Sequence, residues 1–261
     1  MSDDVSAVVV STEDRVGVIE LNRPDKFNSL STALLDGIDR ALDAFERSPE
    51  VRAVLVRAAG KHFCTGADLD EVTAHRRSRH AVAAFIGRGH AVFSRLGASP
   101  LPVVAAVQGL CLAGGLELAL SCDIVFAARS ARFGDQHARF GLVPGWGGSQ
   151  RLARRVGLGR ALDLMFSARW VGAEEARDWG LVNHVEDDDG LAEAALAYCH
   201  ELAAKSAPGL ALMKRLAREG LDQDLAAGLR LEEGAVVDAL LGADAEEGLA
   251  AFRKRREPKF R

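Results

Sequence analysis

Glu117 is the acidic residue whose surroundings most strongly suggest chemistry, because it lies inside the apolar stretch CLAGGLELALSCDIVFA, residues 111–127. A carboxylate is seldom buried without a partner, since removing its charge from water is costly. Gly114 and Gly115 precede it and are expected to begin a helix. The free N–H groups at a helix start can bind an anion or a developing oxyanion. Glu117 is therefore either a reactive group or a first-turn acid that stabilises its own helix.

A second glycine turn, HFCTGADL at residues 62–69, follows the expected strand VRAVLVRA just as AGGLE follows PVVAAVQG. Each strand end could present one backbone N–H group. Two such donors that face one point form an oxyanion hole, which stabilises the negative oxygen of an enolate or a tetrahedral intermediate. The alternative for Gly66 and Ala67 is an ordinary tight turn.

Several common catalytic motifs are absent from the sequence. It contains no GxSxG nucleophile elbow, no P-loop, no HExxH motif and no GxGxxG after a strand. His75 and His80 are five residues apart, which is the wrong interval for two ligands on one helix face, so no metal site is expected. These absences argue against the commonest hydrolase, nucleoside triphosphatase, metalloprotease and dinucleotide-binding classes.

The elements that would position the candidate residues alternate between strands and helices. Residues 7–21 pair two β-branched runs around a polar turn and predict a hairpin, and a helix capped by Ser31 is expected to continue until Pro49. Further strands are expected at 51–58, 102–109 and 123–128, and further helices at 80–97 and from Gly114 onward. This alternation predicts an α/β domain. After about residue 188 the pattern is helical only, which predicts a helical appendage.

Length and composition favour one large domain, or one domain with an appendage. The chain has 261 residues, of which 48% are hydrophobic and 27% are charged. A net charge of -4 gives no general attraction to nucleic acid or to an anionic membrane surface. The longest apolar run, 101–120, contains Pro102, Gln108 and Glu117, and therefore predicts a strand, a turn and a helix rather than a membrane span.

The cysteines and the N-terminus bear on the cellular compartment. The four cysteines lack zinc-finger or CxxC spacing and suit reduced, packed thiols. The N-terminal MSDDVSAVVV is acidic where a targeting peptide needs basic residues. Both features predict a cytoplasmic protein.

Three stretches together resemble the enoyl-CoA hydratase/isomerase family, also called the crotonase family: VLVRAAGKHFCTGADLDE, GLCLAGGLELALSCDIVFAA and FGDQHARFGLVPGWGGSQRL. The similarity extends from LNRPDKFNSLS to about Val185. It implies a ClpP-like core domain of repeated strand-strand-helix turns at 1–195 and a helical trimerisation region at 196–261. It also implies a coenzyme A thioester substrate, no separate cofactor, and a homotrimer or a hexamer of two trimers.

The resemblance also assigns roles to particular residues. The N–H groups of Ala67 and Gly114 would form the oxyanion hole for the thioester carbonyl. The segment Ala67, Asp68, Leu69 and Asp70 would lie along the adenine and pantetheine arm of coenzyme A, and Lys26 would lie near its phosphates. The basic tail FRKRREPKFR is either an addition to the nucleotide site, from this subunit or a neighbour, or a solvated cationic end.

Glu117 matches the first of the two catalytic glutamates of the hydratases in this family, whereas His137 stands where the second is expected. The register is fixed because FG at 133–134 and GLVPG at 141–145 match the family on either side. Histidine can also give and take a proton near neutral pH. The alternative is that His137 has a structural or substrate-contacting role.

The leading hypothesis is therefore a hydratase that adds water reversibly across a 2-enoyl-CoA double bond, with Glu117 as general base and His137 as its acid/base partner. Another reaction of the family, such as double-bond isomerisation, hydrolysis or decarboxylation, uses the same oxyanion hole. A non-catalytic acyl-CoA-binding protein is the alternative from a different class. Glu117 argues against it, because a binding protein has no need of a desolvated carboxylate.

Overall fold

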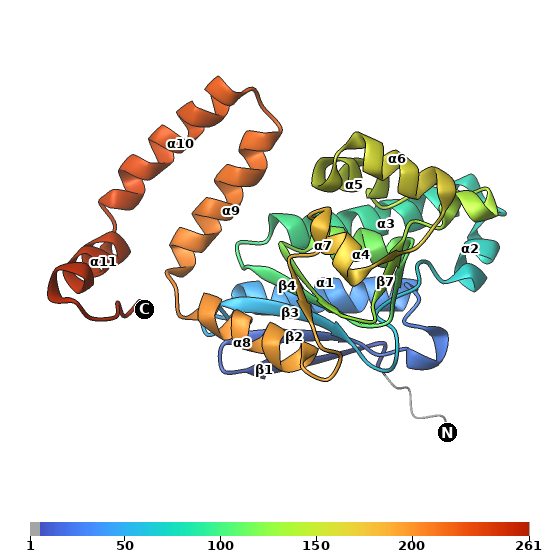
Figure 1. Ribbon diagram of the computed structural model, residues 1–261, viewed down its shortest axis with the longest axis horizontal. Coiled ribbons are helices and arrows are strands. Elements are labelled where there is room, and N and C mark those ends of the chain that lie inside the picture. Colours follow the sequence, from blue (N-terminus) through green and yellow to red (C-terminus); the bar gives the residue numbers. More distant parts are fainter. Residues whose placement is uncertain (1–5, 261) are drawn as a thin grey trace.

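The computed structural model describes residues 6–260 and has at its centre a six-stranded sheet in the order β1-β2-β3-β4-β6-β9 (Figure 1). The strands are β1 (Val8–Glu13), β2 (Val16–Leu21), β3 (Ala53–Ala58), β4 (Val103–Val107), β6 (Ile124–Ala128) and β9 (His184–Glu186). The hairpin β1-β2 is antiparallel and the other neighbouring pairs are parallel. Strand β4 is buried along its whole length, as expected for a parallel strand covered on both faces. The predicted hairpin and the three predicted strands after it are confirmed.

A second, three-stranded sheet positions the two predicted acid/base residues. It has the order β5-β7-β8, formed by β5 (Leu110–Leu112), β7 (Arg132–Gly134) and β8 (Val171–Gly172). Strands β5 and β7 are parallel and end in register, with Leu112 opposite Gly134. The chain then enters α4 (Gly114–Ser121) after β5, and the short 3-10 helix η2 (His137–Phe140) shortly after β7. Glu117 and His137 therefore follow two adjacent strand ends.

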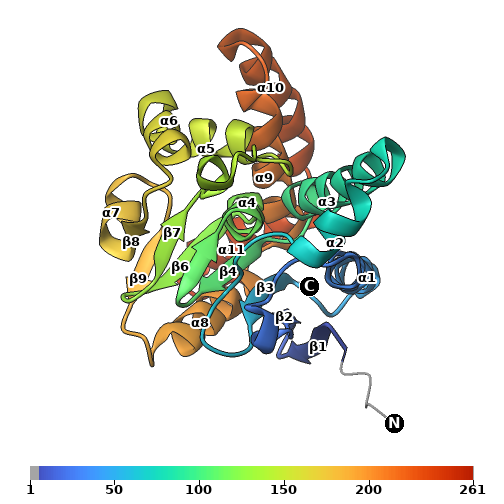
Figure 2. The ribbon, with the colours of Figure 1, turned by 90° about the vertical axis from the view of Figure 1, so that its right-hand side faces the viewer.

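Helices cover both faces of the large sheet, with α1, α3 and α4 on one side and α8 on the other (Figure 2). Helix α1 (Thr32–Arg47) begins as predicted, because the Ser31 hydroxyl accepts a hydrogen bond from the Leu34 N–H group at 3.2 Å. Helix α3 (Arg79–Ala98) agrees with the predicted 80–97 and packs along α1. Helix α8 (Leu191–Ala203) buries Leu191, Ala195, Cys199 and Ala203 against the sheet.

Three further helices extend from the core in an arm (Figure 1). They are α9 (Ala207–Leu221), α10 (Leu225–Leu240) and α11 (Ala243–Lys254), and α9 packs against α10. Pro208 lies in the first turn of α9, where a missing N–H group costs nothing. The predicted division at 195/196 falls inside α8, which packs with the core. That division stays a prediction, and the arm itself begins at Ala207.

The remaining elements are η1 (Pro24–Lys26), α2 (Leu69–His75), α5 (Gly148–Val156), α6 (Leu158–Ser167) and α7 (Ala173–Asp178). The cysteines are all buried free thiols. Within residues 6–260, no helix has both the length and the apolar character that crossing a bilayer requires.

Candidate active site

A cavity of about 550 Å³ lies at the start of α4 and is lined by every residue that the sequence predicted for the site. These residues are Lys26, Ala67, Asp68, Leu69, Asp70, Gly114, Glu117 and His137. They come from four separate stretches of the chain, so the fold brings them together. Their roles are not fixed by this proximity, and the geometry of each group decides what it can do.

The two glycine turns lie against each other at one end of the cavity. The Leu112 N–H group donates to the Cys64 carbonyl at 2.9 Å, and the backbones of Cys64 and Cys111 form an isolated parallel β-bridge. A Cβ atom on Gly115 would lie 2.1 Å from the Cys64 carbonyl oxygen. Gly115 is thus required for the close approach of the Cys64 backbone.

The N–H groups of Ala67 and Gly114 are both free to bind a ligand. Leu30 donates to the Gly66 carbonyl and accepts from the Asp68 N–H group, which turns the N–H group of Ala67 toward the opposite side. Gly114 is the first residue of α4, where an N–H group has no partner within the helix. Across residues 6–260, neither N–H group has a hydrogen-bond acceptor.

Ala113, between these groups, has an unusual backbone conformation. Its φ is +49° and its ψ is -118°, which is sparsely populated for a residue with a Cβ atom. Its N–H group donates to the Gly134 carbonyl at 2.9 Å, so the β7 strand end holds this conformation. The strained residue thus directs the start of α4 toward the cavity.

Glu117 is 1% exposed, and its carboxylate is held by backbone donors from another part of the chain. Its Oε1 accepts hydrogen bonds from the N–H groups of Trp146 and Gly148, both at 2.7 Å. Burial raises the pKa of Glu117, although these two hydrogen bonds and the nearby His137 oppose the rise. Glu117 does not cap its own helix. It is a buried, oriented carboxylate with an elevated pKa at the wall of a cavity, which suits a general base.

His137 is paired with a second buried carboxylate, Asp135. The His137 Nδ1 atom lies 3.0 Å from Asp135 Oδ1, and the Asp135 side chain is 2% exposed. Burial alone would lower the pKa of His137, but the hydrogen bond and charge of Asp135, together with the charge of Glu117, raise it. The pairing leaves Nε2 as the ring nitrogen available to a ligand. The pairing thereby orients the imidazole and favours its protonated form.

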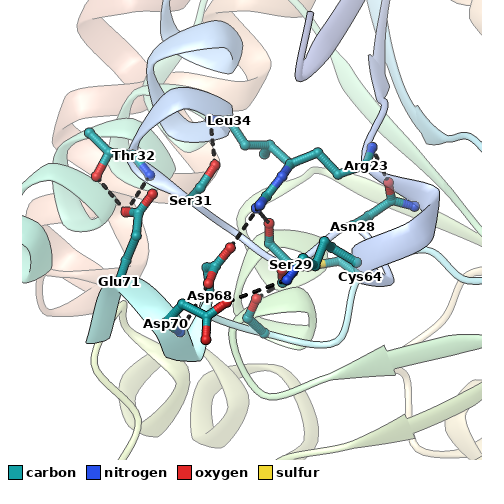
Figure 3. A network of polar contacts seen from close by, with 12 residues as sticks. Arg23, Asn28, Ser29, Ser31, Thr32, Leu34, Cys64, Asp68, Asp70 and Glu71 are labelled. Carbon is teal, nitrogen blue, oxygen red and sulfur yellow. Dashed lines mark hydrogen bonds and ion pairs between the residues drawn. The ribbon is translucent and has the colours of Figure 1, made fainter. Parts of the chain in front are cut away.

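Asp68 and its neighbours fix the turn that carries Ala67 (Figure 3). Asp68 forms an ion pair with Arg23 at 2.8 Å and accepts from the Asp70 N–H group at 3.0 Å, which caps α2. In the first turn of α2, Glu71 accepts from both the N–H group and the hydroxyl of Thr32. The Asp68 carboxylate is therefore occupied by protein partners.

The predicted coenzyme A contacts lie at the exposed edge of the cavity. Leu69 is 65% exposed, and Lys26 lies 3.4 Å from Asp70 in a solvent-exposed ion pair. An ion pair of this kind is weak and can open for an anion. The geometry is compatible with Lys26 near a phosphate, and this role stays a prediction.

Apolar side chains in two groups line the rest of the cavity. Val72 of α2 and Phe85 and Ile86 of α3 form one group, and the other group consists of Phe140, Leu142, Val143, Trp146 and Trp170. The sequence analysis missed this second group, and also missed Asp135. An acid two residues before a candidate catalytic histidine in FGDQH was the available signal.

The fold, the paired turns and the buried carboxylate define an acyl-CoA-processing class of protein, and comparison with known proteins agrees. The model of the enoyl-CoA hydratase/isomerase family matches residues 11–261, and the chain belongs to this family. It is 37% identical over 254 residues to a probable enoyl-CoA hydratase of Rhizobium meliloti, with 97% of each chain covered. It is 36% identical to the human mitochondrial methylglutaconyl-CoA hydratase, covering 99% of this chain and 78% of that protein.

Solved structures show the same architecture. An enoyl-CoA hydratase from Polaromonas sp. JS666 has a TM-score of 0.94 at 32% identity, covering 97% of this chain and 99% of that chain. An enoyl-CoA hydratase from Bacillus anthracis has a TM-score of 0.93 at 34% identity, covering 97% of this chain and 98% of that chain. The predicted crotonase fold is confirmed.

Proposed function

We propose that this protein catalyses the reversible hydration of a 2-enoyl-CoA to a 3-hydroxyacyl-CoA. The observation that carries the proposal is the presence of two unlike groups in one cavity: a buried carboxylate, Glu117, and an imidazole with a raised pKa, His137. Two free N–H groups, on Ala67 and Gly114, line the same cavity. Base, acid and oxyanion donors are the groups that addition of water to a conjugated thioester requires.

Each group has one step in this mechanism. Ionised Glu117 takes a proton from water, whose oxygen forms the bond to the β-carbon of the substrate. The double-bond electrons move toward the thioester carbonyl, whose negative oxygen is stabilised by the two N–H groups. Protonated His137 then gives its proton to the α-carbon. Glu117 ends protonated and His137 neutral, and a proton passed from Glu117 to His137 restores the starting state.

Coenzyme A is part of the substrate in this proposal, and the chemistry uses no resident cofactor or metal. The segment Ala67 to Asp70 lies along its pantetheine and adenine arm, with Lys26 near the phosphates, supported by their positions at the cavity edge. We also propose a homotrimer, or two trimers in a hexamer, in the cytoplasm. The apolar surface of the arm supports the assembly, and the buried free thiols support a reducing compartment.

The decisive experiment is a panel of coenzyme A esters tested against the wild type and Glu117→Gln. We expect the wild type to hydrate a 2-enoyl-CoA, and Glu117→Gln to lose about 10²- to 10⁴-fold in kcat while still binding the ester, since only the base is lost. Isomerisation, hydrolysis or decarboxylation without hydration would replace the hydratase proposal with that reaction. Binding without any turnover would identify an acyl-CoA-binding protein.

Thermal unfolding at pH 8 is the control for that variant. The pKa of Glu117 is raised in the folded protein, so its contribution favours the folded state at low pH and is lost as pH rises through the folded pKa. Ionised Glu117 therefore costs stability at pH 8, and Glu117→Gln should unfold at the same or a higher temperature. A sharply lower midpoint would mean that lost activity reflects lost folding.

A further inference from the structure

Arg151 in α5 is a partly buried cation that has no carboxylate partner within ion-pair distance among residues 6–260. Its Nη1 atom donates to the Trp146 carbonyl at 2.7 Å and its Nη2 atom donates to the Ser94 hydroxyl at 3.3 Å. A guanidinium group that is partly withdrawn from water is stabilised by an acidic partner, because losing contact with water is costly for a charge. The position of Arg151 therefore calls for an explanation.

The loop at residues 146–148 lies between Arg151 and Glu117. The N–H groups of Trp146 and Gly148 donate to Glu117, whereas the carbonyl of Trp146 accepts from Arg151. The loop thus directs two N–H groups toward the Glu117 carboxylate and one carbonyl group toward the Arg151 guanidinium. If the loop rotated, both contacts would be lost together.

The two glycines of this loop each make room for one of the two charges. A Cβ atom on Gly147, whose φ is +102°, would lie 2.2 Å from Arg151 Nη1. A Cβ atom on Gly148 would lie 3.0 Å from Glu117 Cγ and 3.1 Å from its Oε1. A side chain at Gly147 would therefore clash with Arg151, and a side chain at Gly148 would crowd Glu117.

The electrostatic environment links the same two residues. Burial lowers the pKa of Arg151, and Arg218 of α9 lowers it further, whereas Glu117 is the acid that opposes this. Glu117 also faces His137 and Asp135, and it shares its cavity with Lys26, Asp68, Asp70 and Arg139. Of these groups, Arg151 is the cation held behind the loop that binds the Glu117 carboxylate.

We propose that Arg151 is a positioning residue, which holds the 146–148 loop through the Trp146 carbonyl and so keeps Glu117 oriented and ionised for water activation. The proposal rests on the hydratase function proposed above for this cavity. Arg151 touches neither water nor substrate in this role. Its effect reaches the reaction through the two N–H groups that bind Glu117.

The test compares Arg151→Met, which removes the charge, with Arg151→Lys, which keeps it. Arg155→Met is the matched control, because Arg155 is also partly buried in α5 but donates to the Cys122 carbonyl, away from the loop. For each protein, kcat/KM is measured from pH 5 to 9. The carboxyl band of Glu117 is titrated separately by infrared difference against Glu117→Gln, without substrate, so this readout does not depend on the assigned reaction.

We expect the acid limb of kcat/KM and the infrared titration of Arg151→Met to move upward by about half a pH unit or more, since the carboxylate loses its cation and its fixed donors. Arg151→Lys should restore most of this shift, and Arg155→Met should leave both titrations in place. An unshifted infrared titration in Arg151→Met, or an equal shift in Arg155→Met, would overturn the proposal. Wild-type protein without hydratase turnover, but with the expected infrared shifts, would overturn the proposed reaction and retain the positioning role.

Discussion

At the scale of single residues, the pairing of His137 with Asp135 distinguishes this site from one with two glutamates. A carboxyl group must be protonated to act as an acid, which at neutral pH requires a strongly raised pKa. An imidazole beside a buried carboxylate carries a proton near neutral pH more readily, because the carboxylate favours the charged ring. The proposed hydration would thus use a different proton carrier, and this carrier would depend on Asp135.

This pairing predicts a bell-shaped dependence of kcat/KM on pH. Ionised Glu117 and protonated His137 are both required, so the acid limb reflects the raised pKa of Glu117 and the basic limb the raised pKa of His137. Asp135→Asn removes the main group that raises the pKa of His137, so the pKa falls, because burial opposes the charged ring and only the charge of Glu117 still favours it. The basic limb should therefore move to lower pH while the acid limb changes less.

His137→Glu and His137→Ala are the controls for this profile. His137→Glu should retain hydration of a short 2-enoyl-CoA, because it restores two carboxylates, whereas His137→Ala should lose most of it. If both variants hydrate like the wild type, or if Asp135→Asn leaves the basic limb unmoved, His137 is not the acid. Hydration by His137→Glu alone would show that the native reaction is a different one.

At the scale of elements, helix α3 positions Glu117 indirectly through Trp146. Phe85 and Phe93 of α3 contact the Trp146 ring edge to face, with centroids 5.2 and 5.7 Å away. Between them, a Cβ atom on Gly89 would lie 2.2 Å from Trp146 Nε1. The helix thus forms a slot for the indole of the residue whose N–H group binds Glu117.

Gly89→Ala should therefore displace Trp146 and reduce both stability and activity. We expect a loss of about 1–3 kcal/mol in the free energy of unfolding, as overpacking usually gives, together with at least a tenfold lower kcat/KM. Gly87→Ala is the control two residues away, because its Cβ atom meets nothing within 4 Å. It should stabilise α3 by roughly 0.5–1 kcal/mol with unchanged kinetics. Equal behaviour of the two variants in denaturant titration and assay would contradict the slot.

The elements that the sequence predicted well carry their signals locally. The hairpin at β1-β2, the Ser31 cap and the apolar periodicity of α1 each depend on neighbouring residues. Helix α2 was missed because its stability depends on contacts with Arg23 and Thr32, more than 35 residues away. The short strands β5, β7 and β8 were also missed, since their pairing comes from tertiary contacts.

The candidate site shows the same division between local and distant signals. Glu117 stood out in the sequence because a charge in an apolar run is conspicuous locally. Its partners, the N–H groups of Trp146 and Gly148, are backbone groups, so side-chain identity does not reveal them. Arg151 likewise carried no signal in the sequence, because its contact with the Trp146 carbonyl depends on the fold of the loop.

At the scale of the whole molecule, the chain exposes more surface than a compact monomer of its size. Its accessible surface is 14086 Å². A compact protein of 27.8 kDa should expose about 11,000 Å². The arm accounts for part of the excess, because α9 and α10 contain no buried residue. Large apolar side chains are exposed along it: Met213, Leu221, Leu225, Leu229, Val236, Val237, Leu240, Leu249 and Phe252, with Leu241 just after α10.

An exposed apolar surface of this extent is typical of a subunit interface. We therefore expect sedimentation at three or six times the chain mass.

Leu241→Glu and Phe252→Glu, which alter side chains that are each 84% exposed, should yield smaller species, because burying an unpaired carboxylate at an interface is costly. Val10→Glu, at a 43–47% exposed stretch of the edge strand β1, is the control and should sediment like the wild type. A wild-type monomer, or arm variants that assemble normally, would mean that the arm folds back or stays exposed. Because the candidate active-site cavity is lined by residues 26–170 and by none of the arm, we expect dissociated variants to keep the infrared titration of Glu117 even where coenzyme A binding weakens.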